Sequence, residues 1–585
     1  MAEKRPLDLL LLHAPSVYDF REKAILYGPL SDLIPSSPVF EMYPLGFLTM
    51  ASYLQDRGMR VRIVNLALRM MDSRRFDVPK FLKKFHPRAV GIDLHWLPHA
   101  HGALEVAKIV KEIHPDVPVI LGGLSSTYFH EELIRYPQVD YVLRGDSTEP
   151  PLYDLLRGLG EHGLGDPEKL RAVPNLTWKW NGLPQMNALE FTPPSLDYAD
   201  LRPDRMIEMV MEHGDLRSVM PFNHWWRNPI TAVFTAKGCA HQCATCGSSQ
   251  STCVHLTKRH RPAFRSPASL TANIQAIAKI TKAPVFLVGD LLQGGRAHGE
   301  ELLDCLKRAR IKNEIVFEFF APPPKDFLQR IDDSVQNWSI EVSPDSHDAG
   351  VRRSLDRKPF YENKTMEASL QAALALRCHR IDVFYLIGIP HQTHQSVLDT
   401  VTYCEHLFRI TDKRLSCFIS PVGPFVDPGS RAFEDPELFG YRFFARTLEE
   451  HRQLLVQPSW ESILNYETES MTRAQLVDAT YDAAERLNAL KLQFGRVPKR
   501  RGMRVAQRIR EARELRRRIA EHDGCLEADL KGEVARFSQS TVCDKRELFW
   551  PRRLINFRIG EILRIGYRHY FPGPSRIPAD LESAR

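Results

Sequence analysis

Short apolar runs alternate with amphipathic stretches along the first 158 residues. Between the runs, segments such as "GFLTMASYLQDRG" and "GALEVAKIVKEIHP" place apolar residues at the spacing of a helix face. This alternation predicts a doubly wound α/β domain with a parallel sheet, and such sheets bind ligands at the carboxyl ends of their strands. The predicted strands are 7–14, 60–65, 89–94, 117–123 and 139–145.

A second alternation of the same kind covers residues 229–430. Helical stretches such as "SLTANIQAIAKI" and "MEASLQAALAL" separate six apolar runs, which right-handed crossovers would join into a parallel sheet. Six such steps predict a partial (β/α)6 barrel, related to the eight-stranded barrel whose active site lies at the carboxyl ends of the strands. The predicted strands are 231–236, 284–289, 314–319, 338–343, 381–389 and 415–420.

The remaining residues divide into a linker, 159–228, and a C-terminal region, 431–585, that is mostly helical and basic. In the linker, "NLTWKWNGLPQMN" predicts a β-hairpin that turns at Asn181-Gly182. In the C-terminal region, residues 471–495 are amphipathic, and residues 496–522 carry eleven Arg and Lys against three Glu. We interpret this basic stretch as a solvated helix face, with contact to anionic lipid or RNA as the alternative.

Composition limits the class of protein. A chain of 585 residues is too long for one hydrophobic core, so several domains are expected. It contains no apolar stretch of about 18 residues, and its N-terminal apolar run is too short and mixed for a secretory signal. We therefore expect a cytoplasmic protein, in which ten unevenly spaced cysteines stay reduced. A net charge of +7 permits anionic partners without requiring one.

Three cysteines lie close together in "KGCAHQCATC", directly after the predicted strand 231–236. Cys239, Cys243 and Cys246 have the spacing C-x3-C-x2-C. A buried structural trio and a zinc site are two interpretations, and zinc would need a fourth ligand such as Cys253 or His255. The third is a [4Fe–4S] cluster held by three thiolates, because such a cluster leaves one iron open for a substrate or cofactor.

This triplet, after the first strand of a six-step barrel, resembles the radical S-adenosylmethionine (SAM) superfamily. The resemblance implies that the open iron binds SAM and that the reduced cluster cleaves it to a 5′-deoxyadenosyl radical. Thr245 stands where the family usually has an aromatic residue. The segments "FLVGDLLQGG", "IEVSPDS", "RRSLDRKPF" and "YLIGIPHQT" resemble the family's SAM contacts, although Gly and Pro also serve ordinary turns. The implied SAM-binding residues are Asp290, Glu341, Ser343, Arg357, Gly388 and Pro390.

Four N-terminal segments resemble the Rossmann-like cobalamin-binding domain that precedes many radical SAM barrels. They are "YPLGFLTMASYLQDRG", "VGIDLHW", "LGGLSSTYFHEELI" and "VDYVLRGDSTEP". The base-off signature D-x-H-x-x-G is absent after the first strand, but "DLHWLP" imitates its start after the third strand, with Pro98 in place of glycine. His95 is either a lower-face contact of the corrin or a cap of its strand end. The implied cobalamin-binding residues are His95, Trp96, Gly122, Gly123, Thr127, Gly145 and Glu149.

The resemblance implies a cobalamin-dependent radical SAM enzyme with a [4Fe–4S] cluster, SAM and cobalamin as cofactors. A methyltransferase that acts on an unactivated carbon of a lipid or natural-product-like substrate is the first hypothesis. A cyclase or carbon-skeleton-rearranging enzyme is the second, and a cobalamin sensor without enzymatic activity is the third. An external low-potential electron donor is expected, whereas a nucleic-acid partner is not.

The final basic and aromatic segment has two main interpretations, with contact to RNA as a third. In "RELFWPRRLINFRIGEILRIGYRHYFPGP", apolar residues interleave with arginines at helical spacing. The helix either docks on the barrel or lies on a membrane surface, because amphipathic helices of this composition suit that interface. The second interpretation predicts peripheral contact with the inner face of the membrane.

Overall fold

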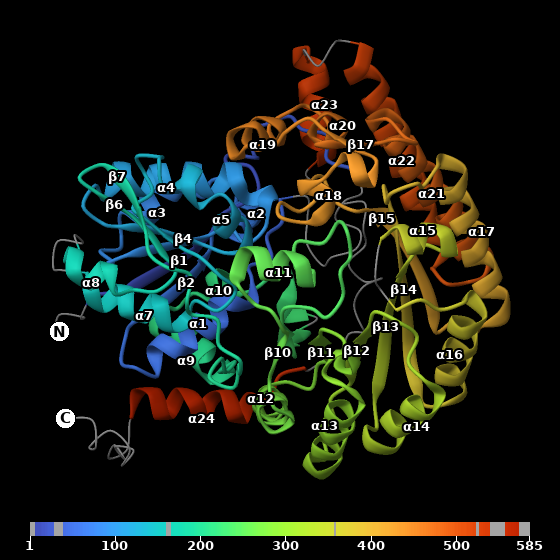
Figure 1. The fold of residues 1–585 in the computed structure, drawn as a ribbon, viewed down its shortest axis with the longest axis horizontal. Helices are drawn as coiled ribbons and strands as arrows, with labels where there is room; N and C mark the ends of the chain where they lie inside the picture. The colour runs from blue at the N-terminus through green and yellow to red at the C-terminus, as the bar shows by residue number, and fades with distance from the viewer. Residues whose placement is uncertain are drawn as a thin grey trace.

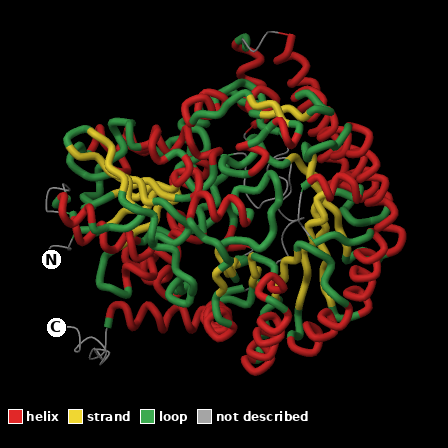
Figure 2. The backbone as a smooth tube through the Cα atoms, in the orientation of Figure 1, coloured by secondary structure: helices red, strands yellow, loops and turns green. Residues whose placement is uncertain are grey.

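The computed structural model describes residues 6–28, 39–159, 165–227, 229–355, 359–521, 526–538 and 556–571. Two large sheets lie beside each other, one from the N-terminal strands and one from the middle of the chain (Figure 1). Figure 2 shows the second sheet as a curved layer of strands with helices along its outer side. The predicted α/β fold class is therefore confirmed.

The N-terminal sheet has seven strands in the order β2-β1-β3-β4-β5-β6-β7. The first five are parallel to their neighbours and match the five predicted strands. Because β3 is central among these five, its carboxyl end lies in the middle of the edge where a ligand is expected. The five strands are β1 (Leu9–His13), β2 (Val61–Asn65), β3 (Val90–Asp93), β4 (Val119–Gly122) and β5 (Tyr141–Leu143).

Both faces of this sheet are buried, which explains the uninterrupted leucines of β1. Leu10 and Leu12 pack in the core beneath α3 (Val78–Leu82) and α4 (Ala100–Ile113). Leu9 and Leu11 belong to the opposite core, formed with α1 (Leu45–Gln55) and α7 (Glu149–Gly158). A strand covered on both sides loses the apolar and polar alternation of a half-exposed strand.

The predicted hairpin is confirmed, and it extends the N-terminal sheet. β6 (Leu176–Trp180) pairs with β7 (Leu183–Met186), so the turn is at Asn181-Gly182. Asn181 and Gly182 both have positive φ, as this tight turn requires. β6 also pairs antiparallel with β5, so part of the linker is joined to the first sheet. Two linker helices, α9 (Pro203–His213) and α10 (Leu216–Val219), follow.

The second sheet has six parallel strands in the sequential order β15-β14-β13-β12-β11-β8. β8 and β15 are its two edges, so the sheet is an open, partial barrel as predicted. The strands are β8 (Thr231–Phe234), β11 (Val285–Val288), β12 (Ile315–Phe319), β13 (Trp338–Asp345), β14 (Cys378–Ile387) and β15 (Leu415–Pro421). The helices between them are α12 (Pro267–Ile280), α13 (Arg296–Ala309), α14 (Lys325–Ser334), α16 (Asn363–Ala375) and α17 (His394–Ile410).

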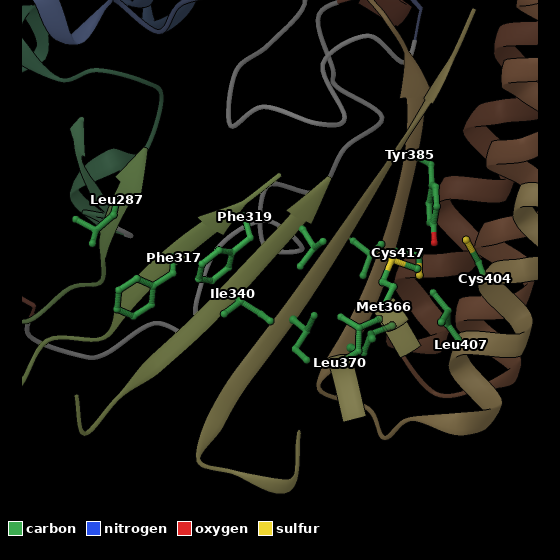
Figure 3. Close-up of a cluster of buried hydrophobic side chains, with 14 of the residues drawn as sticks. Leu287, Phe317, Phe319, Ile340, Met366, Leu370, Tyr385, Cys404, Leu407 and Cys417 are labelled. Carbon is green, nitrogen blue, oxygen red and sulfur yellow. The ribbon is translucent and has the colours of Figure 1, made fainter. Parts of the chain in front are cut away.

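The barrel core lies between these strands and their outer helices. Figure 3 shows Phe317, Phe319 and Tyr385 among the side chains of this core. Cys404 and Cys417 also belong to it, and both are fully buried. Burial raises the pKa of the Cys404 thiol well above its usual value. These two cysteines therefore serve packing, unlike the three at the end of β8.

The C-terminal region packs against the barrel through helices, as predicted. α21 (Arg473–Gln493) lies against α17 and β15, and α22 (Lys499–Glu521) lies against α21. Several basic residues of α22 form ion pairs. Arg516 contacts Glu461 and Asp478, and Arg518 contacts Glu533 on α23 (Ala528–Ser538). These ion pairs therefore connect α22 to other elements of the C-terminal region. In the described part of the chain, no helix has the length and apolar character needed to cross a membrane.

Candidate functional site

A cavity of about 710 Å³ lies between the N-terminal domain and the barrel, and both contribute to its wall. The N-terminal wall comes from the carboxyl ends of β3, β4 and β5, and the barrel wall from the ends of β8, β11, β12 and β13. These are the edges where each sheet type positions ligands. The volume is within the usual range for a site that holds small molecules.

Glycine loops form the N-terminal wall. Gly122 ends β4, and Gly123 follows with a φ of +117°. A Cβ atom on Gly123 would lie 2.4 Å from the Cα atom of His95, so only glycine allows this close approach. Thr127 joins two loops, because its hydroxyl donates to the carbonyl of Gly123 and accepts from the N–H of Gly145, both at 2.9 Å.

Beneath these loops lies a chain of hydrogen-bonded side chains. Nδ1 of His95 lies 2.6 Å from a carboxylate oxygen of Asp93, whose oxygens also lie 3.0 and 3.1 Å from Nδ1 of His13. The side chain of His95 is 30% exposed and lines the cavity, whereas Asp93 and His13 are buried. Burial by itself raises the pKa of Asp93, but the two histidines lower it well below its usual range. Asp93 is thus a buried carboxylate that orients His95.

The cysteine loop forms the opposite wall, and Cys239, Cys243 and Cys246 all line the cavity. Two backbone N–H groups point at sulfurs: His241 N lies 3.4 Å from Cys239 Sγ, and Ser248 N lies 3.4 Å from Cys246 Sγ. Such N–H groups stabilise thiolates that ligate a cluster. No three His, Cys, Asp or Glu side chains among the described residues lie close enough together to share a single metal ion.

The two candidate zinc ligands lie in different surroundings. Cys253, on α11 (Gln250–Thr257), also lines the cavity, and its thiol donates to the carbonyl of Ser248 at 3.4 Å. Burial raises the pKa of this thiol to about 12. His255 is exposed and faces a separate surface hollow. His255 and the cysteine triplet are therefore in different cavities.

Of the SAM-binding residues expected from the sequence, Asp290 and Ser343 line the cavity. Asp290 accepts hydrogen bonds from the N–H groups of Leu292 and Phe320, and burial raises its pKa to about 6. Glu341, on β13, does not line the cavity. Burial, with the nearby carboxylates of Asp382 and Glu318, raises the pKa of Glu341 well above its usual value. Arg357 lies outside the described residues.

Gly388 and Pro390 do not reach the cavity wall. The carbonyl of Gly388 accepts from the Tyr441 hydroxyl at 2.7 Å, and a Cβ on Gly388 would lie 2.8 Å from the hydroxyl oxygen of Tyr466. The carbonyl of Pro390 accepts from the Ser354 hydroxyl at 3.0 Å. In this structure the loop therefore packs against C-terminal elements, and its contact with adenine stays a prediction.

Two of the residues expected to contact cobalamin instead connect the domains. Glu149 is buried, accepts from the Thr49 hydroxyl at 2.7 Å and lies 3.4 Å from the ammonium group of Lys237. Trp96 packs edge-on against Phe40 and contributes a hydrogen bond to the buried Asp427. Neither residue lines the cavity.

A bidentate ion pair of low exposure connects the two domains. The guanidinium of Arg259 binds both carboxylate oxygens of Asp146, at 2.5 and 2.8 Å. Asp146 belongs to the loop after β5, while Arg259 follows α11 and donates to the carbonyl of Pro193 at 2.9 Å. Burial alone would raise the pKa of Asp146, but Arg259 lowers it. Because Asp146 also lines the cavity, this pair fixes the relative position of its two walls.

Replacing Arg259 by alanine is expected to lower the free energy of unfolding by roughly 3 kcal/mol, because Asp146 would keep a buried charge without its partner. Urea unfolding followed by tryptophan fluorescence measures the effect. Arg296→Ala is the matched control, because Arg296 forms exposed pairs with Glu300 and Asp326, and its removal should lower stability far less than removal of Arg259. Equal losses in the two variants would contradict a special role for the bridge.

Several residues of this site were not identified from the sequence. The side-chain carbonyl of Gln293 accepts from the N–H of Ala240 at 2.7 Å and lies 3.2 Å from Cys239 Sγ. Gln293 thus fixes the start of the cysteine loop. It belongs to "FLVGDLLQGG", a segment from which the resemblance implies only Asp290 as a SAM contact. His13, Asp146 and Arg259 carried no signal, because their roles depend on contacts between segments distant in the sequence, whereas Asp93 is the first residue of "DLHWLP" and was quoted there only as part of that motif.

Comparisons with known proteins agree with this arrangement. Residues 33–152 match the family model of the B12 binding domain. An uncharacterized methyltransferase, PH0819, from Pyrococcus horikoshii is 30% identical over 213 residues. That match covers 35% of this chain and 40% of the relative, so it spans less than half of either protein.

Two solved structures share the fold over most of the chain. One is the radical SAM methyltransferase TsrM from Kitasatospora setae with cobalamin and a [4Fe–4S] cluster bound. Its TM-score is 0.56 at 16% identity, and the match covers 83% of this chain and 89% of TsrM. The other is the cobalamin-dependent SAM radical enzyme OxsB with aqua-cobalamin and SAM bound. Its TM-score is 0.52 at 11% identity, covering 99% of this chain and 80% of OxsB.

Proposed function

The chain joins a B12-binding domain to the fold of cobalamin-dependent radical SAM enzymes, and from this premise we propose that it is a radical SAM enzyme that methylates an unactivated carbon. The observation that supports the proposal is a shared cavity. The three cysteines of the barrel and the glycine loops of the N-terminal domain line the same cavity. Two cofactors bound to these walls would therefore face a common substrate.

The described residues fit these cofactors. Cys239, Cys243 and Cys246 would hold a [4Fe–4S] cluster, because they line one wall and two of their sulfurs accept backbone N–H groups. Asp290 and Ser343 would contact SAM beside it. The open loops at the ends of β4 and β5 would hold cobalamin. When bound, the cluster with SAM supplies a hydrogen-abstracting radical and cobalamin supplies a methyl group.

The chain itself positions these groups. Gln293 holds the cysteine loop through the Ala240 N–H, and Glu318 accepts from the N–H of Gly289 at 2.6 Å. Both side chains line the cavity and brace the loops at the ends of β8 and β11. Asp290 accepts backbone N–H groups through both carboxylate oxygens, which holds its side chain in place, and burial raises its pKa to about 6.

The cavity size favours a small-molecule or lipid substrate over a macromolecule. The proposal includes an external low-potential electron donor and a cytoplasmic location, where thiols stay reduced.

The test is an anaerobic assay of protein reconstituted with cluster and cobalamin, given SAM and a low-potential reductant. 5′-Deoxyadenosine and S-adenosylhomocysteine are quantified separately. Methyl transfer predicts both products, because SAM then serves as radical source and as methyl donor. Deoxyadenosine alone would indicate a cyclase or a skeleton rearrangement. A protein that binds cobalamin but forms neither product would be a cobalamin sensor.

One exposed helix supports contact with a membrane surface. α24 (Ile559–Tyr570) packs on α9 through its buried side, where Gly566 lies against Met211 (Figure 1). Its outer side carries an apolar stripe, each member of which is more than half exposed, beside the exposed Arg558 and Arg568. Arginines beside apolar side chains suit an anionic lipid surface, which we propose as the partner. The stripe consists of Ile559, Leu563, Tyr567 and Phe571.

Leu563→Glu is expected to reduce binding to anionic vesicles at least tenfold, since burying one leucine contributes roughly 1.5–3 kcal/mol. Flotation with phosphatidylcholine vesicles, with and without phosphatidylserine, measures it. Leu438→Glu is the control, because Leu438 is equally exposed on another element, Glu437–Phe439. Binding that is weak in the wild type, or lost equally in both variants, would show that the stripe does not dock on lipid.

A further inference from the structure

We propose that His95 is the protein ligand on the lower face of the cobalt when cobalamin is bound, with Asp93 and His13 as its positioning residues. The inference rests on the proposed function, because it assumes that cobalamin occupies the cavity. It goes further by assigning one nitrogen atom to the metal.

The tautomer of His95 follows from its partner. Asp93 is the hydrogen-bond partner of His95 within the described residues, and a carboxylate accepts, so Nδ1 carries the hydrogen. In neutral imidazole the other nitrogen, Nε2, then carries the lone pair. Histidines that ligate metals commonly donate their second ring N–H to a carboxylate, which fixes the ring and strengthens the ligand. His95 has this arrangement, and its ring lines the cavity.

The neighbouring histidines cannot take the same role. Nε2 of His13 donates to the carbonyl of Phe40 at 2.9 Å and Nδ1 faces Asp93, so both of its nitrogens are engaged. His99 donates from Nδ1 to the carbonyl of Ala14 at 3.1 Å and is almost fully buried. Their ring centroids lie within 6.2 Å of that of His95, so they form a buried support beneath it. His95 is the member of the cluster that lines the cavity.

The position of His95 suits a planar ligand lying on the sheet edge. It follows β3, the central strand of the five parallel strands, by two residues. On the side of β4, Gly123 lies against the backbone of His95, and Gly145 follows at the end of β5. Both glycines line the cavity together with His95. A corrin ring resting there would have His95 beneath its metal.

Electron paramagnetic resonance of cob(II)alamin bound to the protein tests the assignment. A nitrogen ligand below the cobalt splits its hyperfine lines into triplets. Protein grown with ¹⁵N-labelled histidine should convert the triplets to doublets, because the nuclear spin of ¹⁵N gives two lines where ¹⁴N gives three. The benzimidazole of cobalamin itself stays unlabelled, so triplets that persist in labelled protein, or lines without nitrogen splitting, would overturn the inference.

Variants add a second readout. His95→Ala should bind cobalamin yet lose the nitrogen splitting, whereas His86→Ala, an exposed histidine of the same domain, should keep it. Asp93→Asn should reduce or broaden the splitting by reorienting the ring, an effect that loss of stability alone would not produce. Splitting retained in His95→Ala would contradict the assignment. If the wild type retains no cobalamin, the proposed function fails and the inference with it; if cobalamin is retained without histidine splitting, only the inference fails.

Discussion

Cys243→Ala is expected to abolish formation of 5′-deoxyadenosine and to lower the iron bound after reconstitution. A site with three thiolates has no spare ligand. Loss of one thiolate should therefore reduce activity by more than the roughly 10–100-fold that is typical of a residue that only supports a ligand. Cys253 lines the same cavity, but it lies on α11 and its thiol donates to the carbonyl of Ser248, which makes it a poor replacement. Iron analysis and quantification of deoxyadenosine under anaerobic conditions measure both effects.

Cys305→Ala is the matched control for this experiment. Cys305 is also a partly exposed free cysteine, but it lies on α13 and outside the cavity. We expect its removal to change neither iron content nor deoxyadenosine formation. If Cys243→Ala retains wild-type iron and activity, the triplet does not bind the cluster, and the radical SAM interpretation would be wrong.

Gly122→Phe is expected to lower cobalamin affinity at least tenfold, about 1.4 kcal/mol, while leaving the fold intact. A Cβ atom on Gly122 would meet its nearest neighbour, the carbonyl oxygen of Leu143, at 3.8 Å, an ordinary contact. The residue ends a strand and lines the cavity, so a phenylalanine there would extend into the space assigned to the corrin. Gly123 is unsuitable for this test, because its positive φ and the close His95 backbone would strain any substitution.

Equilibrium titration with hydroxocobalamin, followed by absorbance, gives the affinity, and thermal unfolding shows that the variant is folded. Gly532→Phe on α23 is the control, since a Cβ there meets only the far end of Arg536 at 3.5 Å. Unchanged affinity in Gly122→Phe would place the corrin away from the end of β4. A large fall in the control would instead indicate a general effect of added aromatic surface.

The sequence determined the order and type of the elements in both sheets. Leu9 to Leu12 form one apolar run because β1 is buried on both faces, and such runs are recognisable without knowledge of their partners. The hairpin turn at Asn181-Gly182 is equally local, since both positions need positive φ. The cysteine triplet could be found for the same reason, because its three residues lie within eight positions of each other. Each of these features depends on residues that are neighbours in the chain, so it can be recognised from the sequence.

Tertiary structure decided which distant residues meet. Asp146 and Arg259 are 113 positions apart, and Asp93 and His13 are 80 apart, so no pattern along the chain connects them. It also separated residues that the sequence placed together: Gly122 and Gly123 line the cavity, whereas Trp96 and Glu149 connect the two domains. His95 shows the difference most directly. Its sequence context allowed a ligand but slightly favoured a strand cap, and the buried Asp93 and His13 beneath it are what orient Nε2 for a metal. The cavity therefore forms where the two domains pack together. This packing brings together segments that are far apart in the chain and that the sequence specified separately.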